Sequence, residues 1–114
     1  MVIENLINLL APLCPEILEQ GSMAQDEQYP TRFFTFWNPS TEDHKHYDNT
    51  PHGYRWDVDV NFYSTDPEDV YSTLEAARKT LLAAGWIIGG KGHAVASDHP
   101  THTGRGFSAT YIEF

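Results

Sequence analysis

The stretch Arg55-Trp-Asp-Val-Asp-Val-Asn-Phe-Tyr63, with the residues directly after it, decides the fold. Apolar residues take every second position of this stretch: Trp56, Val58, Val60 and Phe62. This period of two predicts a β-strand over Arg55–Tyr63 with one face toward a core. The opposite face is polar, so we expect it to meet water or a basic partner surface.

An amphipathic helix is predicted over Asp66–Ala84. Asp66 suits the N-cap, and Pro67 suits the first helical position, where its missing N–H costs nothing. Gly85 is placed to end the helix in the left-handed conformation. We expect an apolar stripe toward the core that consists of Val70, Leu74, Ala77 and Leu81, joined by Tyr71 and Leu82.

The N-terminal part of the chain predicts a helix followed by a short second turn. Apolar residues in Met1–Ala11 recur at helical spacing, and Pro12 closes that helix. Pro15 can begin another helical turn, which we expect over Pro15–Glu19. The polar stretch Met23–Pro30 is either a linker or a weak edge strand.

Thr31–Trp37 is aromatic and β-branched, which predicts a strand. Phe34 and Phe36 would share one face, and Phe33 and Trp37 the other, so we expect both faces to be covered. The polar stretch 38–54 is longer than ordinary connections. We interpret it as an extended loop or hairpin arm between two antiparallel strands.

The C-terminal part predicts a short strand at Trp86–Ile88 that Gly89-Gly90-Lys91-Gly92 breaks or bulges and whose pairing can resume over His93–Ala96. After a polar turn at Ser97–Gly104, a last strand is predicted at Gly106–Phe114. We expect Gly104-Arg105-Gly106 to form a tight entry into the last strand. The resulting order is α–β–β–α–β–β. It predicts a single α+β domain over residues 1–114, with a mixed or antiparallel sheet and the helices packed on one face.

The net charge of −9, from sixteen acidic and seven basic residues, excludes whole classes of partner. A nucleic-acid backbone or an anionic membrane needs clustered Lys and Arg, so we expect neither. The only cysteine, Cys14, lies in an apolar context and is expected in the core. The N-terminus lacks the basic region of a signal peptide, which favours a cytoplasmic protein.

Six histidines raise the possibility of a metal site. His44 and His46 are two residues apart, and His99 and His102 are three apart, so a zinc or nickel site is conceivable. These histidines lie in polar loops, where no rigid element would fix their geometry. We favour the interpretation that the chain holds no metal and no cofactor.

Asp57 and Asp59 share one face of the predicted strand, about 7 Å apart at the usual rise per residue. Such a pair could serve acid–base catalysis, but a solvated or intersubunit face is the favoured interpretation. Gly89-Gly90-Lys91-Gly92 resembles a phosphate-binding loop only superficially, because no helix follows its lysine. No nucleophile motif surrounds Cys14 or Ser22 either. We expect a protein without enzymatic activity.

A family resemblance rests on two motifs. The run Arg55-Trp-Asp-Val-Asp-Val-Asn-Phe-Tyr-Ser-Thr-Asp-Pro67 and the later Ala84-Gly-Trp-Ile-Ile88 resemble the tail-completion proteins of long-tailed bacteriophages, also called tail-terminator or minor tail proteins. In that family, Val-Asp-x-aromatic-Ser ends a strand before a helix, and Ala-Gly-aromatic opens the next strand. The position of 38–54 matches the extended hairpin loop of the family.

The resemblance implies a structural role in virion assembly. Subunits of the family form a ring, usually hexameric, that caps the head-proximal end of the tail tube and joins it to the head connector. The implied partners are other copies of the chain, the major tail protein and the connector. The implied location is the host cytoplasm and then the virion. The candidate assembly surface consists of Asp43, His44, Lys45, His46, Tyr47, Asp57, Asp59 and Asn61.

Two other functions remain open from the sequence. A head–tail connector or adaptor protein is also small, acidic and ring-forming. A metal- or small-ligand-binding domain would use the loop histidines instead. A small hydrolase has the least support.

Overall fold

The strand–helix unit at the centre of the chain forms as predicted. In a computed structural model, which describes residues 2–19, 30–40, 54–90, 92–95 and 101–113, β3 spans Tyr54–Ser64 and α2 spans Pro67–Ala83. The Asp66 side chain accepts a hydrogen bond from the backbone N–H of Glu68 at 3.0 Å, so it is the N-cap. Gly85 has a φ of 96°, in the left-handed region.

The C-terminal end of α2 shows why a glycine is needed there. The N–H of Trp86 donates to Leu81 O at 3.0 Å, and the N–H of Gly85 donates to Leu82 O at 3.2 Å. These are the two bonds of a Schellman motif, which satisfies carbonyls left open at the helix end. The chain is thereby turned toward β4, which spans Ile87–Ile88.

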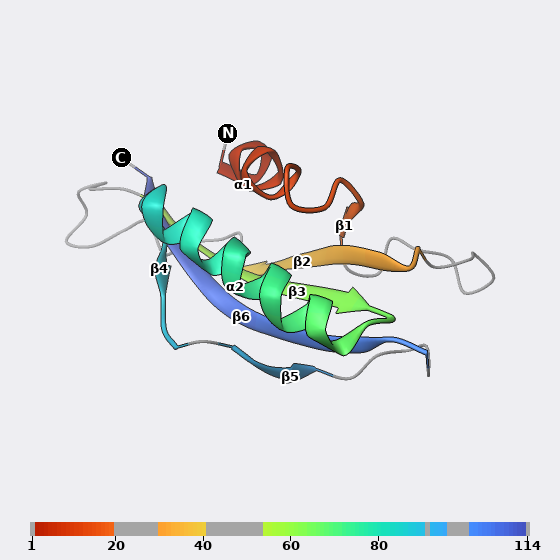
Figure 1. Ribbon diagram of the computed structural model, residues 1–114. Helices are drawn as coiled ribbons and strands as arrows, with labels where there is room; N and C mark the ends of the chain where they lie inside the picture. The colour runs from red at the N-terminus through yellow and green to blue at the C-terminus, as the bar shows by residue number, and fades with distance from the viewer. Residues whose placement is uncertain (1, 20–29, 41–53, 91, 96–100, 114) are drawn as a thin grey trace.

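The described residues form two helices and a six-stranded mixed sheet, which together make the predicted α+β domain (Figure 1). The strand order is β1-β2-β3-β6-β4, and β5 also pairs with β6. All pairs are antiparallel except β1 with β2. The remaining elements are α1 Val2–Leu10, β1 Ile17–Glu19, β2 Arg32–Ser40, β5 His93–Val95 and β6 Thr103–Glu113.

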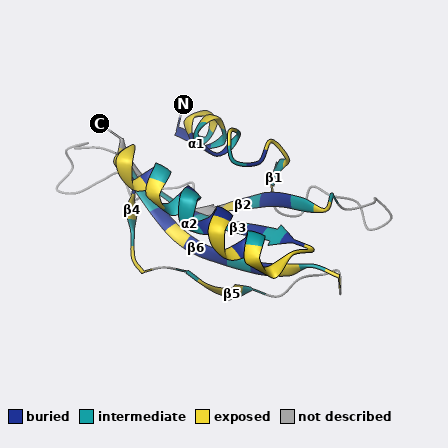
Figure 2. Ribbon diagram, viewed as in Figure 1, coloured by how far each residue is buried: buried dark blue, intermediate teal, exposed yellow. Residues whose placement is uncertain are grey.

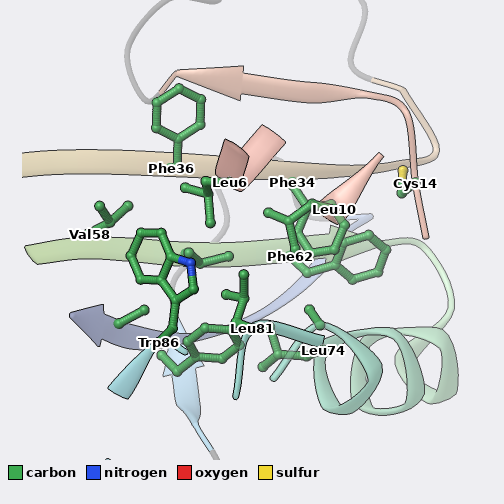
Figure 3. Packing of buried hydrophobic residues seen from close by; sticks show 14 of the residues in the cluster. Leu6, Leu10, Cys14, Phe34, Phe36, Val58, Phe62, Leu74, Leu81 and Trp86 are labelled. Atoms are coloured by element: carbon green, nitrogen blue, oxygen red, sulfur yellow. The ribbon is translucent and has the colours of Figure 1, made fainter. Parts of the chain in front are cut away.

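Both helices lie on one face of this sheet, as predicted. In Figure 1, α2 runs over β3 and β6, and Figure 2 shows its buried residues on the side toward the sheet. Leu6 and Leu10 of α1 belong to the same buried cluster as Leu74 and Leu81 of α2 (Figure 3). The strands contribute alternate residues to this core: Phe34, Phe36, Val58, Val60, Phe62, Phe107 and Ala109.

An ion pair ties the sheet to α2 at the edge of this core. The Arg32 guanidinium donates to both carboxylate oxygens of Asp69 and also to Thr73 Oγ1 at 3.1 Å. A further hydrogen bond of 3.2 Å runs from Arg32 to Leu13 O, which anchors the segment after α1. Cys14 is fully buried close by, as expected for a core residue.

The prediction of a helical turn over Pro15–Glu19 is wrong. Ile17–Glu19 is β1, which lies parallel to β2 with Ile17 opposite Phe34. The N–H of Phe34 donates to Glu16 O at 2.8 Å, so bonding to a distant strand replaces a local helical turn. The order therefore has one strand more than predicted before β2.

Two members of the predicted α2 stripe are exposed instead of buried. Tyr71 is 59% exposed and Leu82 is 41% exposed, whereas Val70, Leu74, Ala77 and Leu81 are buried. A helix over a flat sheet buries a narrow stripe, and these two residues lie beside it. The Arg105 guanidinium lies 4.8 Å from the centre of the Tyr71 ring.

The last strand begins earlier than predicted. Gly104 and Gly106 lie inside β6 and pair with Tyr63 and Asn61, so the strand has already begun where a tight entry was predicted. A Cβ at Gly106 would collide with the Asn61 amide oxygen, and one at Gly104 would meet the Tyr63 ring at 2.6 Å. The glycines make room for these two side chains of β3.

The predicted loop 38–54 is partly strand. β2 continues to Ser40 with an irregularity between Trp37 and Ser40, where Pro39 lacks an N–H for the ladder. β2 and β3 are antiparallel, as predicted for the strands that flank this stretch. The predictions for residues 41–53 lie outside the described residues, as does the predicted linker or edge strand Met23–Pro30 up to residue 29. No helix in the described ranges is long and apolar enough to cross a membrane.

Candidate functional site: the open face of the sheet

The face of the sheet opposite the helices is the candidate functional site, and we call it the open face. Strand alternation directs Asp57, Asp59, Asn61 and Tyr63 of β3 to this side. Phe33, Thr35 and Trp37 of β2 share it, because they pair with Tyr63, Asn61 and Asp59. From β6 and β4 it receives Ser108, Thr110, Ile112 and Ile87.

The two predicted acids of this face are held by hydroxyl groups of the neighbouring strand. Ser108 Oγ donates to Asp59 Oδ1 at 2.8 Å, and Thr110 Oγ1 donates to Asp57 Oδ1 at 2.7 Å. Both aspartates are partly exposed. The hydrogen bonds fix each carboxylate on the surface of the sheet, where it faces outward from the core.

Three large apolar side chains are exposed on the same face. Trp37 is 49% exposed, Ile87 is 61% exposed and Ile112 is 37% exposed. Trp37 is directly opposite Asp59, and Ile87 is opposite Thr110, which pairs with Asp57. An apolar group beside ordered polar groups is typical of surfaces that bind another protein reversibly.

The other end of the open face is aromatic and closed. The rings of Phe33 and Tyr63 are stacked with 5.1 Å between their centroids, and His102 lies 5.7 Å from Phe33. Phe33 is buried there although it is on the side away from the helices. The predicted cover of this face is present within the chain at Phe33. Trp37 is exposed in the single chain, and the cover that a neighbouring chain would give it stays a prediction.

Of the four histidines predicted as candidate metal ligands, His102 is the one that lies within the described ranges, and its ring is engaged inside the protein. Its Nε2 lies 2.8 Å from Pro30 O and must donate to that carbonyl, and its Nδ1 lies 3.1 Å from Thr101 Oγ1. No group of three His, Cys, Asp or Glu side chains that could hold a metal occurs among the described residues. His44, His46 and His99 lie outside them, as do Asp43, Lys45 and Tyr47 of the candidate assembly surface.

Two cavities lie on the helical side of the molecule and away from the aspartates. One has a volume of about 290 Å³ and lies between α1, the end of α2 and Tyr111, with Asn5, Asn8 and Trp86 in its lining. The other, of about 370 Å³, is lined by Tyr71, Leu74, Glu75 and Arg105. Asp57 and Asp59 line neither of these two cavities.

Sequence reasoning missed the contribution of β6 and β4 to this surface. Ser108, Thr110 and Ile112 alternate with Phe107, Ala109 and Tyr111, and this period of two could have revealed an outward row. Which of them meets Asp57 and which meets Asp59 depends on the strand register. That register is a long-range property.

No protein-family model matches this chain, and no curated protein matches it.

Proposed function

We propose that this protein is a tail-completion subunit of a long-tailed bacteriophage. In this role, copies of the chain form a ring that caps the tail tube and joins it to the head connector. The observation that carries the proposal is the open face, where Trp37, Ile87 and Ile112 are exposed around Asp57 and Asp59. The role is structural, and the chain needs no catalytic group or cofactor for it.

The layer arrangement supports a subunit that assembles. A sheet with helices on one face only leaves its other face to water or to a partner. Three of the five large hydrophobic residues that are exposed in the described ranges lie on that other face. The remaining two, Tyr71 and Leu82, lie on α2. The uncovered apolar area is therefore concentrated where a partner would gain most from burying it.

The open face carries both apolar and charged side chains. This supports a subunit that exists free of its partner before it docks. An obligate interface is more apolar and resembles a core cut in half. Here the exposed tryptophan and isoleucines share the face with two carboxylates held by Ser108 and Thr110. Together with the net charge of −9, this keeps the free subunit apart from its copies until a partner is present.

The segment on which the family resemblance rests also forms part of the open face. The run from Arg55 to Pro67 supplies the two acids of the open face and the first residue of α2. A ring requires a heterologous contact, in which two different patches of the subunit meet. The six-fold ring, the tail-tube and connector partners, and the virion location come from the family resemblance.

Tube polymerisation tests the proposal. The major tail protein encoded near this chain's gene would be polymerised with and without the protein, and tube lengths and tube ends measured by electron microscopy. We expect shorter tubes with one additional ring at a single end. Tubes of unchanged length and bare ends would contradict the proposal.

Binding to the isolated head connector tests the alternative role of a head–tail adaptor. A stable complex with the connector and none with tail tubes would favour the adaptor. Stoichiometric zinc or nickel that is lost in the double variant His44→Ala, His46→Ala would favour the metal-binding domain instead. Both experiments use the full chain.

A further inference from the structure

Three residues from three adjacent strands form a row across the open face. Trp37 of β2 is directly opposite Asp59 of β3, and Asp59 is directly opposite Ser108 of β6. Opposed side chains in an antiparallel pair begin about 5 Å apart, so the indole and the carboxylate are neighbours. Ser108 donates to one oxygen of Asp59 at 2.8 Å, which orients the carboxylate.

This row has the chemistry that a guanidinium group recognises. Arginine stacks its planar group on an indole face and donates hydrogen bonds to a carboxylate. Trp37 is 49% exposed, so part of its side chain is accessible to such a group. Burying tryptophan and arginine together is also typical of the residues that dominate binding energy at interfaces.

A second acid extends the row along the strand. Asp57 lies two residues before Asp59 on the same face and accepts a hydrogen bond from Thr110 at 2.7 Å. The two carboxylates are separated by about 7 Å along the strand. The second carboxylate adds negative charge near Asp59, which favours a basic partner.

We infer that the open face binds a segment of its assembly partner that carries arginine, with one arginine between Trp37 and Asp59. The inference rests on the proposed function in taking the open face as the docking surface. It adds the chemistry of the partner.

Charge argues against a second copy seated face to face on this surface. The charged side chains that the structure describes on the open face are Asp57 and Asp59, and both are acidic. A symmetric contact through this face would bring the acids of one copy toward those of the other, and like charges directly opposed are destabilising. A basic segment removes that repulsion and neutralises part of the chain's charge of −9.

Peptide titration tests the inference without tail tubes. The probe is the capped peptide Arg-Thr-Arg-Thr-Arg, titrated into the full chain at low and at physiological salt. Its matched control is the peptide with lysine in place of arginine. We expect the arginine peptide to bind more tightly and to shift the indole N–H resonance of Trp37, because lysine makes no bidentate, stacked contact.

Two pairs of variants distinguish binding at Trp37 and Asp59 from non-specific attraction by the net charge of the chain. Asp59→Asn should weaken binding by about tenfold, whereas Glu4→Gln, which removes an exposed acid from α1, should leave it within about twofold. Trp37→Ala should weaken binding by about fivefold, against little change for Leu82→Ala on α2. Thermal unfolding checks that all four variants fold.

Equal losses in Asp59→Asn and Glu4→Gln would overturn the inference, since they would mean that only net charge matters. Equal affinity for the arginine and lysine peptides, or self-association abolished by Asp59→Asn, would overturn it as well. Failure of the tube assay with these peptide results intact would instead count against the tail role alone.

Discussion

Arg32 and Asp69 form a two-bonded ion pair between β2 and α2. The guanidinium Nε lies 2.9 Å from Asp69 Oδ2, and a terminal nitrogen lies 3.0 Å from Asp69 Oδ1. The same guanidinium lies 5.4 Å from the centre of the Phe62 ring and contacts Leu13 O. One side chain thus connects the segment after α1, the sheet and α2.

Acid unfolding should depend on this pair. Hydrogen bonds from Arg32 hold the pKa of Asp69 below its usual value of 3.8, although burial opposes the shift. A folded pKa below the unfolded one gives stability that is present above about pH 4 and is lost as the pH falls through the folded value. Asp69→Asn should flatten that loss in urea unfolding measured from pH 7 to pH 2.

At pH 7 the same variant should lower the free energy of unfolding by about 1 kcal/mol, because solvent screens the partly exposed Arg32. The control Glu68→Gln removes an exposed acid from the neighbouring position. If both variants lose stability in parallel as the pH falls, the pair does not have the role assigned to it.

Leu74 should be among the most costly residues to truncate on α2. Its side chain is 2% exposed and packs in the shared core, so Leu74→Ala should destabilise the protein by about 2–5 kcal/mol. Leu82→Ala, at a 41% exposed site on the same helix, should cost less than about 1 kcal/mol. Chemical denaturation of both variants checks this, and similar costs would show that the buried face of α2 is misassigned.

Gly106 should not tolerate a side chain. A Cβ there would collide with the Asn61 amide and meet Val60 O at 2.8 Å, so Gly106→Ala should cost about 1–3 kcal/mol. Gly89→Ala has no atom within 4 Å of its new Cβ and should change stability by less than about 0.5 kcal/mol. A Gly106→Ala protein as stable as the parent would contradict the register between β3 and β6.

Sequence reasoning predicted correctly the elements whose signals come from residues that are close together in the chain. Alternation from Trp56 to Phe62 gave β3, and Asp66, Pro67 and Gly85 marked both ends of α2. The same alternation placed Asp57, Asp59 and Asn61 together on one face. These features depend on residues that are neighbours in the chain.

The features that sequence reasoning missed depend on distant partners. Ile17–Glu19 follows a proline that can start a helix, and only pairing with Phe34–Phe36 makes it a strand. Gly104 and Gly106 resemble a tight strand entry in the sequence. The side chains that leave no room for a Cβ there, those of Tyr63 and Asn61, lie more than forty residues earlier. The hydroxyls that hold Asp57 and Asp59 likewise required the strand register.

The central claim is that the open face docks this protein onto a phage tail. Co-sedimentation with tail tubes tests it most directly, with Trp37→Glu compared with Leu82→Glu, since both place a carboxylate at a similarly exposed apolar site. We predict that Leu82→Glu sediments with the tubes as the parent does and that Trp37→Glu stays in the supernatant. Equal sedimentation of the two variants would contradict the claim, as would a parent protein that does not sediment with tubes at all.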